Sequence, residues 1–203
     1  YMKMLGAPAI TMERLADCIS IMHRLWDGET VNYEGVLGKF PMLKLTDMHT
    51  GAKPPIIFTA IGPKSLEFAG THCDGVLLHP FVSTTGVRNS TKIVRDAAEK
   101  AGRDPMSVRI YHNIIVAPDL PQDEEDAVVR GRAITYFELP GFGDLIVEIN
   151  EWDKSVLDQI RAHPKIACLN GKPADQAYTR QELVDVGEEG LCDCVHDRFL
   201  PIN

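Results

Sequence analysis

Short apolar runs alternate with amphipathic stretches in the middle of the chain. Residues 56–60 read IIFTA and residues 76–78 read VLL, each an unbroken run of mostly aliphatic or β-branched side chains. Such runs are typical of strands that are buried on both faces of a parallel sheet. Residues 63–70, between them, carry apolar side chains at helical spacing. The order strand, helix, strand predicts a parallel pair joined by a right-handed crossover.

Helical patterns and a third apolar run flank this central unit. Thr11 can cap an amphipathic helix over residues 12–27, and a second amphipathic helix is predicted over residues 87–101. The apolar run within residues 109–117 predicts a third strand. Residues 32–48 predict a long connection with room for a short hairpin. Further helices are predicted over residues 122–139, 145–149, 156–162 and 179–187.

These elements place the chain in the α/β class. Strands and helices alternate over residues 56–117 with short turns between them, which is the order of a parallel sheet covered by helices. No internal repeat, low-complexity segment or obvious linker interrupts the sequence. We therefore expect residues 1–203 to form a single domain.

Composition and charge narrow the classes of function. Of the 203 residues, 44 % are hydrophobic and 25 % are charged, which is typical of a globular chain with one core. The formal net charge of −8 argues against a nucleic-acid-binding surface or a basic membrane-binding patch. The sequence also lacks the run of about 18 apolar residues that a membrane-spanning helix needs. Neither nucleic acid nor a membrane is therefore expected as a partner.

The cysteines predict reduced thiols and no metal centre. Their odd number and scattered positions do not fit a disulfide framework, which favours a cytoplasmic location. Cys192, Cys194 and His196 resemble part of a metal-binding cluster, but no second pair of ligands stands at a suitable spacing. We interpret the cysteine pair as two small residues in a C-terminal turn. The cysteines are Cys18, Cys73, Cys168, Cys192 and Cys194.

The turn after the first buried strand is the strongest candidate for chemistry. Ile61 and Gly62 leave the strand, and Pro63 suits the first position of a helix because that position needs no N–H. A helix N-terminus presents free N–H groups and a positive dipole end, which favour an anion such as phosphate. Gly62 permits close approach of the backbone, while Lys64 and Ser65 add a positive charge and a hydroxyl group. An ordinary strand–helix connection without a ligand is the alternative.

Several short motifs follow one another in a recognisable order. They are Leu25-Trp26-Asp27-Gly28-Glu29, Val31-x-Tyr33-x-Gly35, Pro54-Pro55-Ile56, Gly62-Pro63-x-Ser65-x-x-x-Ala69-Gly70 and Asp74-Gly75-Val76. In this order they resemble the luciferase-like monooxygenase superfamily, in particular its branch of oxidoreductases that depend on the deazaflavin coenzyme F420. The similarity covers most of residues 10–140, and the motifs are more specific together than singly.

The resemblance implies a (β/α)8 TIM-barrel-type fold with a flavin-like cofactor at the carboxyl ends of the strands. Residues 56–60, 76–78 and 110–116 then correspond to middle and late strands of the barrel. We expect the chain to hold only the middle and C-terminal part of such a barrel, about two thirds of it. The early strands would lie before Tyr1 and the last strand after Asn203.

The resemblance also implies which residues hold the cofactor. Family members bind the cofactor phosphate at the turn that corresponds to Ile61, Gly62, Pro63 and Ser65. A further cofactor contact falls at the end of the following strand, which corresponds to His79, where a packed histidine without a ligand is the alternative. No catalytic residue is assigned, because the family's catalytic groups usually lie on the early strands.

The leading hypothesis is an oxidoreductase that transfers a hydride between coenzyme F420 and a small organic substrate. An FMN-dependent monooxygenase on the same barrel is one alternative, because the turn at Gly62 suits the phosphate of either cofactor. A non-catalytic barrel fragment that serves as an interaction or structural module is the other. An incomplete parallel sheet exposes edges that need cover, so a homodimer is expected.

Overall fold

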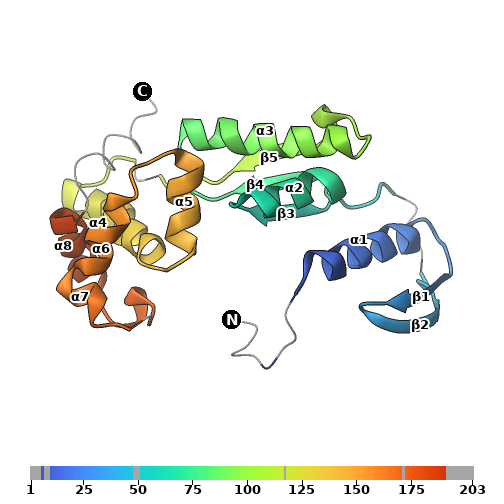
Figure 1. Ribbon diagram of the computed structural model, residues 1–203, viewed down its shortest axis with the longest axis horizontal. Helices are drawn as coiled ribbons and strands as arrows, with labels where there is room; N and C mark the ends of the chain where they lie inside the picture. The colour runs from blue at the N-terminus through green and yellow to red at the C-terminus, as the bar shows by residue number, and fades with distance from the viewer. Residues whose placement is uncertain (1–5, 7–9, 48–50, 117, 171, 191–203) are drawn as a thin grey trace. The chain divides into compact units, whose positions relative to one another are not determined.

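The computed structural model describes residues 6, 10–47, 51–116, 118–170 and 172–190. Contacts within the chain separate it into two compact units, Tyr1–Ile56 and Ile57–Asn203, whose helices and strands are labelled in Figure 1. The first unit contains a helix and a hairpin, and the second contains a parallel sheet with a group of helices.

The first unit begins with helix α1 (Met12–Trp26). The Thr11 hydroxyl oxygen accepts a hydrogen bond from the Arg14 N–H at 3.2 Å, as expected of an N-cap residue. Ile19 and Ile21 are its buried side chains. The predicted helix and its cap are therefore confirmed.

A hairpin follows within residues 32–48, where the sequence leaves room for one. Strands β1 (Val31–Gly35) and β2 (Gly38–Leu43) pair antiparallel. The Tyr33 hydroxyl donates a hydrogen bond to the carboxylate of Asp17 on α1, which ties the hairpin to the helix. The helix and the hairpin therefore form one unit.

A three-stranded parallel sheet forms the centre of the second unit. Its strands, in spatial order, are β3 (Ile57–Ala60), β4 (Gly75–Leu78) and β5 (Arg109–His112). Helix α2 (Pro63–His72) connects the first pair, and helix α3 (Thr84–Lys100) connects the second. The predicted order of strands and helices is confirmed, and the chain has an α/β fold.

Strand β5 is shorter than its apolar run predicts. It ends at His112, and Ile114 and Val116 beyond it are 56 % and 70 % exposed. The register explains this early end, because His112 lies opposite Leu78, the last residue of β4. The Asn113 N–H still donates to the Leu78 carbonyl at 3.5 Å, but no strand of the described residues pairs beyond it, so the prediction of a strand through residue 116 is wrong.

Strand β3 is covered on one face only, although its apolar run predicts burial on both. Phe58 packs against Phe68 of α2, with ring centroids 5.1 Å apart. Successive side chains of a strand point to opposite faces. The face opposite Phe58 carries Ile57, which is 46 % exposed, and Thr59, which is also exposed.

Five helices gather at one end of the sheet (Figure 1). They are α4 (Gln122–Phe137), α5 (Phe142–Asn150), α6 (Ser155–Ala162), α7 (Pro164–Ala167) and α8 (Arg180–Gly190). Four of them correspond to predicted helices, whereas α7 has no counterpart in the sequence-based prediction. Single turns of 3-10 helix lie at Pro105–Ser107 and Ala174–Gln176.

Helix α3 starts three residues before the predicted Val87. The hydroxyl oxygen of Ser83 accepts a hydrogen bond from the Gly86 N–H at 3.2 Å and caps the helix. The prediction starts the helix at its first apolar residue, whereas the cap that begins it is a polar residue farther upstream.

The second unit has one continuous hydrophobic core that joins the sheet to the helices. Leu66, Leu78, Val94, Ile134 and Ile146 are fully buried in it. Among the described residues neither the hairpin nor the parallel sheet closes on itself. None of the helices described here is long and apolar enough to cross a membrane.

Candidate functional site

The turn between β3 and α2 has the geometry of an uncapped helix N-terminus. Gly62 is the N-cap, with φ −79° and ψ 158°, and Pro63 occupies the first helical position. Gly62 has no side chain to bond the first N–H groups, and the Gly62 carbonyl accepts from the N–H and the hydroxyl of Ser65, at 3.1 and 2.8 Å. The first N–H groups of a helix have no partner within it, so the Lys64 N–H lies at the open end.

The register of the sheet brings the end of β4 beside this turn. Ala60 lies opposite Leu78 in the parallel ladder, so the next residues, Ile61 and His79, leave adjacent strands at the same level. Adjacent strands are about 4.8 Å apart. The structure therefore places His79 beside Ile61 and Gly62 at the carboxyl end of the sheet. Pro63 and Ser65 follow in the first turn of α2.

His79 is a buried histidine with one unsatisfied nitrogen. Its side chain is 8 % exposed, and its Nδ1 accepts a hydrogen bond from the Phe81 N–H at 3.3 Å. An accepting Nδ1 carries no proton, so in the neutral ring the proton is on Nε2. Within the described residues Nε2 has no hydrogen-bond partner. A buried donor of this kind is costly unless an acceptor is supplied.

Burial also determines the charge of His79. Desolvation lowers the pKa of His79 from 6.5 to about 4, with smaller contributions from the positive charge of Arg132 and from His112. His112 is the last residue of β5, and its Nε2 lies 3.2 Å from the carbonyl oxygen of His79. At neutral pH His79 is therefore an uncharged donor at the end of β4.

Aromatic rings enclose His79. The ring centroids of Tyr136, Phe142 and Phe81 lie 4.5, 5.2 and 5.8 Å from the imidazole centroid. Tyr136 comes from α4 and Phe142 from α5, so the helices that follow the sheet complete the surroundings of the strand end. This wall explains the burial of His79 and excludes water from its ring.

Helix α5 also covers the turn at Gly62. A Cβ atom built on Gly62 would lie 3.0 Å from Cδ2 of Leu145, a side chain of α5. Leu145 therefore packs directly against the glycine backbone. A ligand at this turn would contact Leu145 as well as the first turn of α2.

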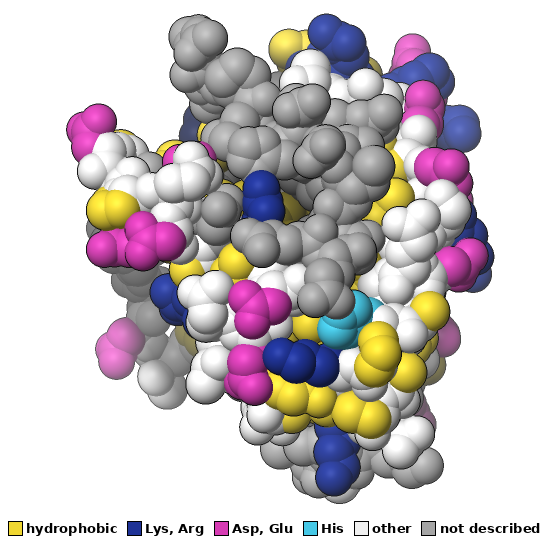
Figure 2. All heavy atoms as spheres, turned by 90° about the vertical axis from the view of Figure 1, so that its left-hand side faces the viewer, with side chains coloured by type: hydrophobic (Ala, Val, Ile, Leu, Met, Phe, Trp, Pro, Cys, Tyr) yellow, Lys and Arg dark blue, Asp and Glu magenta, His cyan; other side chains and the backbone are white. Residues whose placement is uncertain are grey.

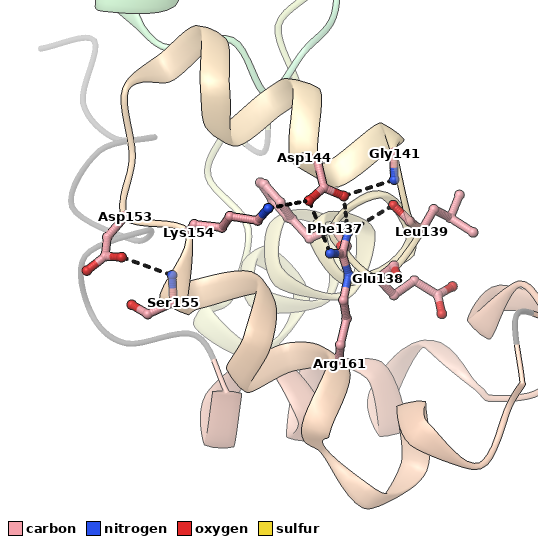
Figure 3. Close-up of polar contacts among 9 residues, drawn as sticks. All are labelled: Phe137, Glu138, Leu139, Gly141, Asp144, Asp153, Lys154, Ser155 and Arg161. Carbon is pink, nitrogen blue, oxygen red and sulfur yellow. Dashed lines mark hydrogen bonds and ion pairs between the residues drawn. The ribbon is translucent and has the colours of Figure 1, made fainter.

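Arg161 of α6 joins the end of α4 to the start of α5 (Figure 3). Its guanidinium donates to the two carboxylate oxygens of Asp144 at 2.8 and 3.4 Å. It also donates to the carbonyl oxygens of Phe137, Glu138 and Leu139 at 3.5, 3.3 and 3.2 Å. The hydrogen bonds that Asp144 accepts from Arg161 and from the Gly141 N–H hold the pKa of Asp144 well below its usual range. We call Arg161, Asp144 and the three carbonyl groups the Arg161 cluster.

Asn150 anchors the other end of α5. Its side-chain oxygen accepts from the Ser83 N–H at 2.7 Å, and its side-chain amide donates to the Phe81 carbonyl at 2.8 Å. The Arg161 cluster and Asn150 therefore hold the two ends of α5 over His79 and Gly62. Sequence reasoning missed both residues, because neither belongs to a motif and their partners are distant in the sequence.

Metal ligands do not gather in the described part of the chain, where no group of three or more His, Cys, Asp or Glu could hold an ion. The candidate pair Cys192 and Cys194 lies outside the described residues. Of the other cysteines, Cys18, Cys73 and Cys168 are free.

The sequence matches a known family over most of its length. Residues 6–177 match the model of the luciferase-like monooxygenases. The chain is 27 % identical over 184 residues to a 5,10-methylenetetrahydromethanopterin reductase of Archaeoglobus fulgidus, with 86 % of the chain and 52 % of that relative covered. It is 34 % identical over 100 residues to an F420-dependent hydroxymycolic acid dehydrogenase of Mycobacterium tuberculosis, with 47 % of the chain and 26 % of that relative covered. The chain thus spans about half or less of the length of these relatives.

Two solved structures share the fold. The coenzyme F420-dependent tetrahydromethanopterin reductase of Methanopyrus kandleri aligns with a TM-score of 0.59 and 18 % identity, over 89 % of this chain and 54 % of its own. An F420-dependent secondary alcohol dehydrogenase in complex with an F420–acetone adduct aligns with a TM-score of 0.57 and 15 % identity, over 98 % of this chain and 52 % of its own. At these identities the likeness is one of fold.

Proposed function

Because the chain belongs to the luciferase-like monooxygenase family, we propose that it serves an oxidoreductase that transfers a hydride between coenzyme F420 and a small organic substrate. The observation that carries the proposal is the juxtaposition of an uncapped helix N-terminus at Gly62 with the buried Nε2–H of His79, which has no partner among the described residues. Relatives and structural neighbours named as F420-dependent support the choice of cofactor.

The residues at the turn fit an anionic group. We assign the cofactor phosphate to the backbone of Ile61 and Gly62 and the first turn at Pro63 and Ser65, where the helix dipole and the open Lys64 N–H favour negative charge. The hydroxyl and the N–H of Ser65 both donate to the Gly62 carbonyl, so the hydroxyl would have to rotate away from that bond to donate to a phosphate. Nε2 of His79 is fully covered in this structure, so His79 would donate to an acceptor atom of the cofactor only after a ring that covers it, Tyr136 or Phe142, moves aside.

Besides binding the phosphate, the chain would orient the cofactor and exclude water from it. F420, when bound, supplies the hydride chemistry. Tyr136 and Phe142 wall off His79 from solvent, and a dry site strengthens every polar contact inside it. Leu145 presents an apolar side chain to the same turn.

We propose further that the chain forms the middle and C-terminal part of a TIM-type barrel, with both compact units in a single domain. The fold shared with the F420-dependent structures supports the barrel, and the parallel strands β3, β4 and β5 would form part of its wall. The homodimer and the cytoplasmic location expected from the sequence stay predictions.

An FMN-dependent monooxygenase is the second candidate function. The family description supports it, because it names monooxygenases, and a phosphate at Gly62 would suit FMN equally well. A non-catalytic barrel fragment remains the alternative from a different class of protein. Direct competition between the two cofactors separates all three possibilities.

The decisive experiment is a titration of the full chain with F420, followed by tryptophan fluorescence, with FMN as the competitor. We expect saturable F420 binding that FMN displaces poorly. Gly62→Val should weaken F420 binding about 30-fold, because its branched side chain would meet Leu145 and displace the packing that shapes the turn. Thr71→Val, at the other end of α2, is the matched control and should leave the affinity unchanged.

The outcomes are separable. Equal affinity of Gly62→Val and the unmodified chain would remove the turn from the site. Displacement of F420 by low concentrations of FMN would favour the monooxygenase. A folded chain that binds neither cofactor would favour the non-catalytic module.

A further inference from the structure

A cavity lies between α4 and the start of α8, away from the turn at Gly62. Its volume is about 450 Å³, which is within the range of small-molecule sites. Ile115, Val128 and Leu183 contribute apolar walls, and Arg132, Arg180 and Asp175 contribute charges. We call this the α4–α8 cavity.

The two arginines of this cavity lack ion-pair partners among the residues that the structure describes. Arg132 donates a hydrogen bond to the Tyr136 hydroxyl at 2.7 Å, and its guanidinium lies 5.0 Å from the centroid of that ring. These contacts orient the guanidinium without neutralising it. A guanidinium has five N–H donors, so Arg132 retains donors for a ligand.

Close packing of α4 on α8 brings the second arginine to the same place. A Cβ atom built on Gly131 would lie 3.2 Å from both Cγ and the carbonyl oxygen of Arg180. The Arg180 side chain therefore crosses α4 directly at Gly131, the neighbour of Arg132. Both arginines line one cavity because a glycine at this position lets the helices approach.

The charges around the cavity match a single negative charge. Asp175 also lines it, so two arginines and one carboxylate leave a net charge of +1. In the coloured part of Figure 2, which faces the helical end of the second unit, basic side chains stand among hydrophobic and acidic ones. This distribution suits a discrete small ligand better than a polyanion.

We propose that the α4–α8 cavity binds a small organic monocarboxylate, with the carboxylate on Arg132 and Arg180 and its apolar body against Ile115, Val128 and Leu183. Arginine forks bind carboxylates with charge-assisted, often bidentate hydrogen bonds, and a pocket with apolar walls holds a hydrocarbon body. The proposal goes beyond the redox function and requires no cofactor.

The cavity is separated from His79 by one aromatic ring. Tyr136 contacts the guanidinium of Arg132 and lies edge-on to His79, with ring centroids 4.5 Å apart. The positive charge of Arg132 contributes to the lowered pKa of His79. A carboxylate bound to Arg132 would offset that charge, so occupancy of the cavity should raise the pKa of His79.

The test is calorimetric titration of the full chain, without cofactor, with three isosteric probes: 4-phenylbutyrate, 4-phenyl-1-butanol and 4-phenylbutylamine. We expect the acid to bind at least about tenfold more tightly than the alcohol or the amine, because only the acid can use both arginines. Arg132→Gln and Arg180→Gln should each weaken binding of the acid about tenfold.

The matched control is Arg88→Gln, which removes the same charge from an exposed position on α3 of the same unit. It should leave the affinity within about twofold, because salt screens distant surface charges. Far-ultraviolet circular dichroism of each variant shows whether the fold is retained, and Arg132→Lys should restore part of the affinity if charge alone contributes.

Three results would overturn the proposal. The alcohol could bind as tightly as the acid, Arg88→Gln could weaken binding as much as the cavity variants do, or the folded chain could bind none of the probes at millimolar concentration. None of these results depends on F420. A failure of the carboxylate-binding proposal can therefore be distinguished from a failure of the proposed F420-dependent function.

Discussion

Replacing Arg161 with alanine is expected to lower the free energy of unfolding by about 3 kcal/mol. Arg161 and Asp144 are 25 % and 31 % exposed, so the pair is largely removed from water. The change removes the guanidinium donors from the Asp144 carboxylate and from the carbonyl oxygens of Phe137, Glu138 and Leu139. Asp144 then keeps the Gly141 N–H at 2.9 Å, and the Leu139 carbonyl keeps the Gly143 N–H at 3.1 Å. Urea unfolding followed by circular dichroism measures the loss.

Lys154→Ala is the matched control for Arg161→Ala. Its ammonium lies 3.5 Å from Asp144 but is 71 % exposed, so solvent screens the pair. We expect a loss of at most about 0.5 kcal/mol. Equal losses for the two variants would show that the Arg161 cluster adds nothing beyond a surface ion pair.

The Arg161 variant also tests whether the ends of α5 matter for the site. Phe142 and Leu145 cover His79 and Gly62 from this helix, and the Arg161 cluster holds its first turn. A loosened α5 should expose His79 to water. Its pKa, measured by NMR in a folded sample of the variant, is then expected to move upward toward 6.5.

Lowering the pH from 7 to 4 is expected to destabilise the second unit by up to about 3 kcal/mol through His79 alone. Its pKa is lowered from 6.5 to about 4 in the folded chain, so between these values the unfolded chain binds more protons than the folded one. The contribution of His79 to the free energy of unfolding is therefore fully present above pH 6.5 and is lost as the pH falls toward 4. Below about pH 4 this contribution no longer changes with pH.

The measurement is the free energy of unfolding in urea at a series of pH values. His79→Leu should show a shallower fall than the unmodified chain between pH 6.5 and 4. The comparison with His79→Leu is needed because burial also lowers the pKa values of His112 and His72. These two histidines make the free energy of unfolding fall with falling pH in the unmodified chain and in the variant alike. Identical slopes would mean that His79 is not buried as a neutral ring.

Local pattern sufficed for strands β3 and β4 and for the start of helix α2. The runs at residues 56–60 and 76–78 form parallel strands, and the glycine–proline pair between them starts a helix. These features are local, because strand burial, helix caps and proline geometry depend on a few neighbouring residues. The candidate turn at Gly62 could be located for the same reason.

Errors arose where neighbours in space decide the outcome. Ile114 and Val116 look like strand residues, yet the strand ends at His112 because β4 ends at Leu78. Whether residues 1–203 form a single domain stays a prediction, since contacts divide the chain into two compact units that the sequence does not mark.

The sequence by itself determined the α/β class, the family motifs and the helix N-terminus at Gly62. Only the tertiary structure decided that His79 is an uncharged donor, because its burial comes from Tyr136 and Phe142, more than 50 residues away. It also decided that Arg161 and Asn150 anchor α5 over the site. Packing between residues distant in the sequence determines how far a side chain is removed from water and which hydrogen-bond partners it meets. Neither property produces a periodic pattern that could be found in the sequence.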